Sequence, residues 1–236
     1  MNYWMNVAGQ QIYYSFAYEN TRSFFGDELH KTEEIQGYSV TVLEPLNEWY
    51  MRIYGGDHSY AEYMNSLYLT SNYLLQFNCC AYHSVAIRVN GKAYLIAADS
   101  GVGKTTQYRN LRELYGDRIE IINGDKPILQ FTKNEIIVHT SPWRGKEHYG
   151  SDISGKLAGI VFLRQWKHNW IQRMNPEDMV VLSFSKFLYH PDCEETVRKV
   201  AELDRQLLNT IPVYLFDNKG DLESSELLYK SILCGE

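Results

Sequence analysis

The residues from position 98 to position 105 have the types and the order that suit a loop around phosphate groups. Gly101 and Gly103 let successive backbone N–H groups curve around phosphate oxygens without interference from side chains. Lys104 can reach the β and γ phosphates as a point charge, and the Thr105 hydroxyl can complete the shell of a magnesium ion that the nucleotide already coordinates. The sequence therefore predicts that the chain binds ATP together with Mg²⁺. The residues predicted to contact the nucleotide are Asp99, Ser100, Gly101, Val102, Gly103, Lys104, Thr105 and Thr106.

The segments on both sides of this loop favour the same interpretation. Residues 94–97 form an apolar run typical of a buried strand, and residues 105–115 predict a helix whose N-terminus faces the phosphates and which Gly116 ends. The usual pattern opens with glycine, but this chain has Ala98 at that position. The alternative is therefore a strand, a turn and a helix that contain a lysine by chance. The flanking strand and helix favour phosphate binding because the motif requires that context.

Asp125 and His83 are predicted to lie beside the phosphates. Asp125 follows an apolar strand about twenty residues after the loop, where an acid can coordinate magnesium or accept the proton of an attacking hydroxyl. His83 precedes a predicted hairpin over 84–97, which brings it beside the end of the strand that leads into the loop, where it can contact phosphate. The alternative for Asp125 is an aspartate that only stabilises a turn, and the alternative for His83 is a structural histidine at the start of a strand.

Residues 141–148 place two cations, an acid and a histidine in one loop after a predicted strand. Arg144 or Lys146 could neutralise charge on a phosphoryl group during its transfer. A solvated turn around a packed Trp143 is the alternative.

The elements that position these residues are predicted to form an α/β fold. The predicted strands are 84–89, 93–97, 118–122, 127–131, 136–140, 157–163 and 213–216, and the predicted helices are 58–76, 105–115, 194–208 and 222–233. Ser59 is the expected N-cap of the first helix. The Asn90-Gly91 turn gives the strand before the loop an antiparallel neighbour, which indicates a mixed sheet. We assign residues 1–80 to a small N-terminal α+β lobe with a joining helix, and residues 81–236 to the nucleotide-binding domain.

The composition narrows the classes of partner. The 236 residues carry a formal charge of −6, so no basic surface for nucleic acid or anionic lipid is expected. No apolar stretch approaches the roughly 20 residues of a membrane span and the start lacks the pattern of a secretion signal, which predicts a cytoplasmic protein. The 19 tyrosines are scattered along the chain and are therefore interpreted as core and boundary residues rather than as a stacking platform.

The order of His83, hairpin, loop, Asp125 and the Pro142-Trp143-Arg144-Gly145 segment resembles the catalytic domain of the HPr kinase/phosphorylase family, and most of all its smaller serine-kinase-like relatives. The resemblance implies a P-loop core of mixed β-sheet flanked by helices, related to ATP-dependent phosphoenolpyruvate carboxykinase. It also implies a magnesium requirement and phosphoryl transfer from ATP to a serine hydroxyl. His83 matches the histidine of the family's Leu-His-Gly segment, although Tyr82 and Ser84 flank it here.

The chain departs from the family at two acidic positions. Asp125 matches the second acid of an Asp-Asp pair whose first member is here Gly124. Pro142 stands where the family has a metal-binding glutamate two positions before the arginine, Arg144 in this chain. The loss of two carboxylates weakens the expectation of the family's reverse reaction, and Glu147 could compensate as a metal ligand beside Thr105 and Asp125.

These observations predict a kinase that phosphorylates a hydroxyl-bearing peptide, protein or small molecule. The alternative is a nucleotide-binding regulatory module that has lost catalysis and acts through a protein partner. A carboxykinase would need a larger substrate domain than a chain of 236 residues provides. Relatives of this kind assemble through their catalytic domains, so a homo-oligomer is compatible with the resemblance.

Overall fold

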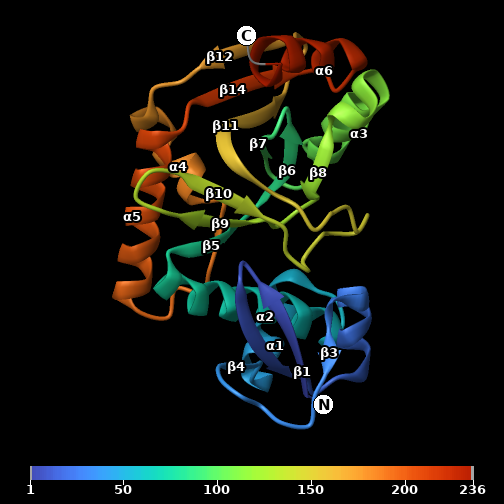
Figure 1. Cartoon of the computed structure of the whole chain (residues 1–236), viewed down its shortest axis with the longest axis vertical. Helices are drawn as coiled ribbons and strands as arrows, with labels where there is room; N and C mark the ends of the chain where they lie inside the picture. The colour runs from blue at the N-terminus through green and yellow to red at the C-terminus, as the bar shows by residue number, and fades with distance from the viewer. Residues whose placement is uncertain (1, 235–236) are drawn as a thin grey trace.

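The polypeptide folds into two β-sheets with helices packed against them (Figure 1). The structure is a computed structural model that describes residues 2–234. The large sheet contains β5 (Cys79–Tyr82), β6 (Ser84–Val89), β7 (Lys92–Ala97), β8 (Glu120–Asn123), β9 (Ile128–Phe131), β10 (Ile136–His139), β11 (Ser154–Gln165), β12 (Trp170–Arg173), β13 (Phe187–Leu188) and β14 (Val213–Asn218). Its order is β13-β5-β9-β10-β11-β7-β6-β8, and β14 pairs with β11 and β12.

The sheet is mixed, as the hairpin predicted. Strand β7 is antiparallel to β6 and parallel to β11, which also runs parallel to β14. The two-residue turn Asn90-Gly91 has φ angles of 51° and 75°, which suit asparagine and glycine in a tight hairpin. Ser84 consequently pairs with Ala97, so the start of β6 lies beside the end of β7.

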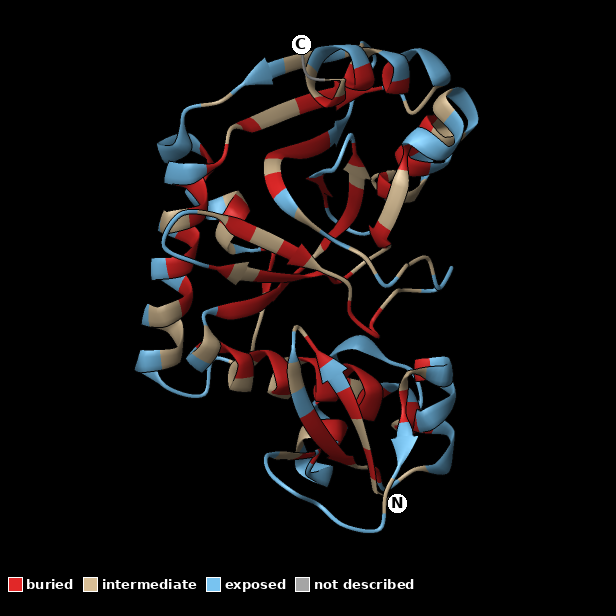
Figure 2. Cartoon of the chain, viewed as in Figure 1, coloured by how far each residue is buried: buried red, intermediate tan, exposed pale blue. Residues whose placement is uncertain are grey.

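Helices cover both faces of the large sheet, and its central strands are buried on both sides (Figure 2). The side chain of Leu95 packs in the core beneath α4 (Pro176–Phe184) and α5 (Glu194–Thr210). Its neighbours Tyr94 and Ile96 pack in the core beneath α3 (Lys104–Tyr115) and α6 (Leu222–Leu228), because successive strand residues point to opposite faces.

The small sheet has the order β3-β1-β2-β4 and lies at the lower end of Figure 1. Its strands are β1 (Asn2–Val7), β2 (Gln10–Ser15), β3 (His30–Lys31) and β4 (Ser39–Thr41), with 3₁₀ turns over Glu19–Glu28 and the helices α1 (Glu44–Tyr54) and α2 (His58–Leu74). The apolar core beneath this sheet includes Tyr14 and Leu67, and it continues into Ile128 and Trp143 of the other part of the chain. Helix α2 is therefore packed between the small sheet and the large one.

Several predicted elements are corrected at their ends. Asp57, not Ser59, caps α2, because its carboxylate accepts a hydrogen bond from the backbone N–H of Tyr60 at 2.8 Å. A 3₁₀ turn over Gly116–Arg118 delays the strand predicted at 118 until β8. The helix predicted over 222–233 keeps α-helical geometry only to Leu228 and continues as a π-helical turn, Tyr229–Leu233.

Four elements were not predicted, namely strands β5, β12 and β13 and helix α4. Short buried or half-exposed runs have no clear period in the sequence.

No helix within residues 2–234 is both long enough and apolar enough to cross a bilayer.

A buried carboxylate on α5, Asp204, makes the stability of this fold depend on pH. Its side chain accepts a hydrogen bond from the Ser183 hydroxyl at 2.5 Å, and burial raises the pKa of Asp204 to about 6. In the unfolded chain, the pKa of an aspartate side chain is near 3.9. Between about pH 4 and about pH 6, Asp204 is therefore protonated more often in the native state than in the unfolded state. The free energy of unfolding should therefore fall as the pH rises through this window.

Asp204→Asn should remove that dependence while its amide oxygen still accepts from Ser183. We expect urea unfolding to show a variant more stable than the parent by about 1–3 kcal/mol at pH 7.5 and nearly equal to it at pH 4. The exposed Glu202→Gln on the same helix is the matched control. An equal difference at both pH values would show that ionisation is not the cause.

Candidate active site

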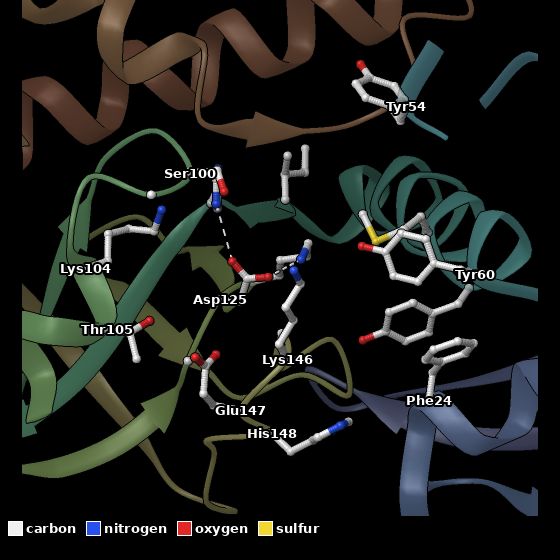
Figure 3. A pocket seen from close by; sticks show the side chains of 18 of the residues that line it. Phe24, Tyr54, Tyr60, Ser100, Lys104, Thr105, Asp125, Lys146, Glu147 and His148 are labelled. Atoms are coloured by element: carbon white, nitrogen blue, oxygen red, sulfur yellow. Dashed lines mark hydrogen bonds and ion pairs between the residues drawn. The ribbon is translucent and has the colours of Figure 1, made fainter. Parts of the chain in front are cut away.

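A cavity of ≈ 830 Å³ opens where the loop after β7, the start of α3 and the turn after β8 face the aromatic side chains of the N-terminal part (Figure 3). The charged groups that line it include four cations, Lys104, Arg109, Lys126 and Lys146, and two acids, Asp125 and Glu147. The excess of positive charge is local, since the chain as a whole carries −6. The cavity therefore favours an anionic ligand.

The loop between β7 and α3 wraps around the ammonium group of Lys104. Its Nζ donates to the carbonyl oxygens of Ala98 at 2.9 Å and Asp99 at 3.2 Å. Gly101 and Gly103 have φ angles of 82° and 111°, which bend the loop back over this group and which other residues rarely adopt. Burial lowers the pKa of Lys104, whereas the nearby charge of Asp125 acts in the opposite direction. The predicted strand and helix on the two sides of the loop are confirmed as β7 and α3, and the helix begins at Lys104.

A second buried lysine, Lys186, supports this loop and was missed by sequence reasoning. It lies between α4 and β13 with 4% exposure, and its ammonium group pairs with the Asp99 carboxylate at 2.5 Å. Its carbonyl oxygen accepts a hydrogen bond from the backbone N–H of His83 at 2.7 Å. The ion pair lowers the pKa of Asp99. No spacing or motif around Lys186 signals this contact, because its partners, Asp99 and His83, lie far away in the sequence.

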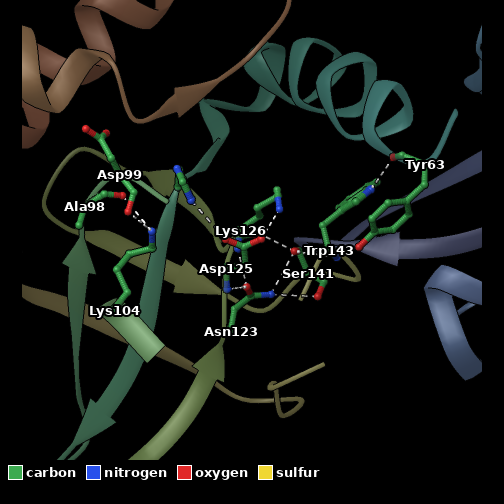
Figure 4. Close-up of polar contacts among 10 residues, drawn as sticks. Tyr63, Ala98, Asp99, Lys104, Asn123, Asp125, Lys126, Ser141 and Trp143 are labelled. Atoms are coloured by element: carbon green, nitrogen blue, oxygen red, sulfur yellow. Dashed lines mark hydrogen bonds and ion pairs between the residues drawn. The ribbon is translucent and has the colours of Figure 1, made fainter. Parts of the chain in front are cut away.

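The turn that carries Asp125 is held by a buried amide (Figure 4). The Asn123 side-chain oxygen accepts from the backbone N–H groups of Asp125 at 2.9 Å and Lys126 at 2.7 Å. Its Nδ2 donates to the carbonyl and the hydroxyl oxygens of Ser141, at 3.0 and 3.1 Å. The amide thus fixes the Asp125 backbone and joins it to the loop after β10.

The Asp125 carboxylate lies between two basic side chains. His83 Nε2 is 3.3 Å from one oxygen, and the Lys126 ammonium pairs with the other. Burial by itself would raise the pKa of Asp125, but the hydrogen bond from His83 and the charge of Lys126 outweigh it and hold the pKa well below its usual range. Asp125 is therefore ionised at neutral pH. The register of β6 and β7 places His83 beside the end of β7, as the hairpin predicted.

Two glycines let the backbone approach this carboxylate closely. A Cβ on Gly145, which has a φ of 74°, would come within 2.9 Å of the Asp125 Cβ. A Cβ on Gly124 would come within 2.9 Å of the Tyr149 Cβ and 3.1 Å of the Arg144 carbonyl oxygen. Gly124 therefore leaves no room for a carboxylate side chain without movement of the neighbouring loop.

The structure turns Arg144 away from the role predicted for it. Its guanidinium group donates to the Glu28 carboxylate at 2.5 Å and to the Ser141 carbonyl oxygen at 3.3 Å, and its side chain lies against Gly150. Arg144 is not among the residues that line the cavity, whereas Lys146 is exposed there. Contacts with the 3₁₀ turns of the N-terminal part explain the difference, since sequence spacing cannot reveal a partner so distant. Of the two predicted cations, Lys146 is the one at the cavity.

The predicted magnesium ligands Thr105, Asp125 and Glu147 all line the same cavity. Glu147 also lies 3.4 Å from the guanidinium group of Arg109. Within residues 2–234, no three His, Cys, Asp or Glu side chains come close enough together to hold a metal ion by themselves. Magnesium often uses only one or two carboxylates and takes its remaining ligands from phosphate and water. A hydroxyl from Thr105 and a carboxylate from Asp125 suit that pattern.

Comparison with solved structures gives distant likenesses in fold. No family description and no curated protein matches the sequence. The fold is similar to that of the HPr(Ser) kinase/phosphatase from Coxiella burnetii, with a TM-score of 0.29 and 11% sequence identity over 53% of this chain and 88% of that chain. A likeness this distant assigns neither a family nor an activity to the chain.

Proposed function

We propose that the protein is a kinase that uses ATP and Mg²⁺ to phosphorylate a serine hydroxyl of a peptide, a protein or a small molecule. The observation that carries the proposal is the buried Lys104 ammonium group, which the glycine-containing loop encloses at the N-terminus of α3 beside the ionised Asp125. Backbone N–H groups, a helix N-terminus and an ammonium group at one place form a site for the phosphates of a nucleotide.

In this proposal, some residues bind the nucleotide and the metal ion, and others hold those residues in position. The loop backbone and Lys104 hold the β and γ phosphates, and the Thr105 hydroxyl with the Asp125 carboxylate would hold Mg²⁺. When bound, this ion neutralises phosphate charge. His83 and Lys186 keep Asp125 and Asp99 in place through the contacts described above. Lys146, an exposed residue that lines the cavity, adds positive charge there.

In the transfer, the serine oxygen forms a bond to the γ phosphorus as the bond to the β,γ-bridging oxygen breaks, and ADP leaves. Asp125 accepts a hydrogen bond from the attacking hydroxyl and so orients it, and then takes up its proton and releases it to solvent. A carboxylate with a depressed pKa is a weak base, but the loose transition state of phosphoryl transfer requires little proton abstraction before the phosphorus–oxygen bond has broken. Orientation is therefore its larger contribution.

Phosphorus NMR of the protein with Mg-ATP, free serine and serine-containing peptides tests the proposal. We expect a new phosphoester resonance that grows in step with ADP. ATP that binds but stays intact with every acceptor would contradict the kinase.

A second candidate, a regulatory module that binds nucleotide without turnover, is favoured by the packing at Gly124. The side chain and backbone of Tyr149 occupy the space that a first acid of the pair would need. With this function, ATP would remain intact in the NMR experiment, and a protein partner would bind only to the nucleotide-loaded form.

A further inference from the structure

The side of the cavity opposite the glycine loop is made of aromatic rings from the N-terminal part of the chain. We name it the aromatic wall. It consists of Phe24, Tyr50, Tyr54, Tyr60, Tyr63 and Tyr68. The rings pack against one another, with centroids 5.1 Å apart for Phe24 and Tyr63 and 4.8 Å apart for Tyr50 and Tyr54. The wall is therefore formed before any ligand arrives, and it needs little reorganisation to bind one.

Asp125 lies between the phosphate side and the aromatic wall. Figure 3 shows Lys104 and Thr105 on one side of its carboxylate and Tyr60 and Phe24 on the other. In an in-line transfer, the attacking oxygen approaches the γ phosphorus from the side opposite the leaving oxygen. If the loop around Lys104 holds the β phosphate, the acceptor must therefore enter from the side of the aromatic wall. The base of the nucleotide must then extend in a different direction, away from that wall.

The hydroxyl groups of Tyr60, Tyr63 and Tyr68 stay neutral and can donate hydrogen bonds. Burial, with smaller contributions from neighbouring tyrosines and from the charge of Asp125, raises the pKa of Tyr68 to about 12. The same main cause raises the pKa of Tyr60 and of Tyr63. Such a surface provides flat apolar faces together with neutral polar edges, a combination typical of surfaces that bind peptides and proteins.

The apolar surface continues from the wall onto the outside of α1. Tyr54 is 63% exposed, and its ring lies 6.3 Å from that of Trp49, which is 52% exposed. Ile53, on the same helix, is 57% exposed. Contiguous exposed apolar side chains of this kind mark interaction surfaces. A ligand that follows them extends beyond the cavity, which favours a polypeptide over a compact small molecule.

We infer that the acceptor is a peptide segment, free or within a protein, in which an aromatic side chain lies next to the phosphorylated serine. The serine hydroxyl reaches Asp125, the neighbouring ring packs on the aromatic wall, and the following residues cross Tyr54 toward Trp49. This inference rests on the proposed kinase function and adds the class of its acceptor.

Calorimetric titration of the 236-residue protein with two unlabelled peptides tests the inference without any need for turnover. The peptides are Gly-Gly-Ser-Trp-Gly-Gly and Gly-Gly-Ser-Ala-Gly-Gly. We expect the tryptophan peptide to bind at least about tenfold more tightly, which corresponds to the burial of one ring. Tyr54→Ala and Tyr60→Ala should each remove most of this preference, and Trp170→Ala, an exposed ring on β12 outside the cavity, should not.

Equal binding of the two peptides would overturn the inference. So would wall variants that weaken the binding of Mg-ADP instead of the peptide, because the wall would then hold the base. Phenethyl alcohol that binds as tightly as the tryptophan peptide would point to a small acceptor and would also overturn it.

The transfer reaction separates this inference from the proposed function. Where the protein transfers phosphate, Tyr54→Ala should raise KM for the tryptophan peptide about tenfold and leave kcat nearly unchanged. Selective peptide binding with no transfer would contradict only the kinase function. Transfer to both peptides with equal kcat/KM would contradict only the acceptor class.

Discussion

Replacing Lys104 by methionine should lower kcat/KM for phosphoryl transfer by about 10³-fold and weaken the binding of Mg-ATP by at least about tenfold. The ammonium group is held by carbonyl oxygens of its own loop at the N-terminus of α3, where we propose that it contacts the phosphates. Methionine has a similar length and removes only the charge. Because burial already disfavours the charged form, the variant should unfold at the same temperature as the parent or at a higher one.

Lys92→Met provides the matched control. Lys92 lies at the exposed start of the same strand, β7, and does not line the cavity. It should leave transfer and nucleotide affinity unchanged, as measured by coupled ADP release and by calorimetric titration. A folded Lys104→Met protein that transfers phosphate at the parent rate would show that Lys104 has no role in the transfer.

Replacing Asp125 by asparagine should lower kcat by about 10²–10⁴-fold, because it removes the ionised carboxylate that we propose orients the acceptor hydroxyl. It should also destabilise the fold, since the buried Lys126 and the half-buried His83 lose the charge that they face. The loss of one partner from such a pair costs about 3–5 kcal/mol in a fully buried site and less in this partly exposed one. Urea unfolding and a kinetic assay at matched fractions of folded protein measure the two effects separately.

The double variant Asp125→Asn with Lys126→Met distinguishes loss of chemistry from loss of structure. Removal of the unpaired ammonium group should restore most of the stability but none of the transfer. If the double variant recovered activity together with stability, Asp125 would have only a structural role.

The pH dependence of the single variant has a defined sign. The pKa of Asp125 is depressed in the folded state, so its ionic contribution is present above the unfolded value near 3.9 and is lost as the pH falls toward the folded value. The stability difference between the parent and Asp125→Asn should therefore persist from pH 5 to pH 8 and close under strongly acidic conditions.

The strands, the hairpin and the helix around the glycine loop could be predicted because their signals are local. Alternation over residues 84–89, the Asn90-Gly91 turn and the apolar run before the loop each depend on neighbours within a few positions. The short strands β5 and β13 could not be predicted in this way. They are stabilised by pairing with distant strands and not by a pattern of their own.

Many of the tyrosines are core or boundary residues as expected, but their gathering into the aromatic wall could not be predicted. Along the sequence these rings are scattered, which indicated core and boundary residues. In the structure, the packing of α1 and α2 against the small sheet turns several of them toward Asp125. Helix periodicity places residues on one face, but the partner of that face is decided by the fold.

The sequence by itself determined the loop, its flanking strand and helix, and the approach of His83 to the end of β7, because hairpin register and loop geometry depend on adjacent residues. Only the tertiary structure decided which charges meet. Lys186 pairs with Asp99 across 87 positions of sequence, and Arg144 pairs with Glu28 across 116. Contacts at such separations leave no periodic trace in the sequence, since they arise from the packing of whole elements rather than from the order of neighbouring residues.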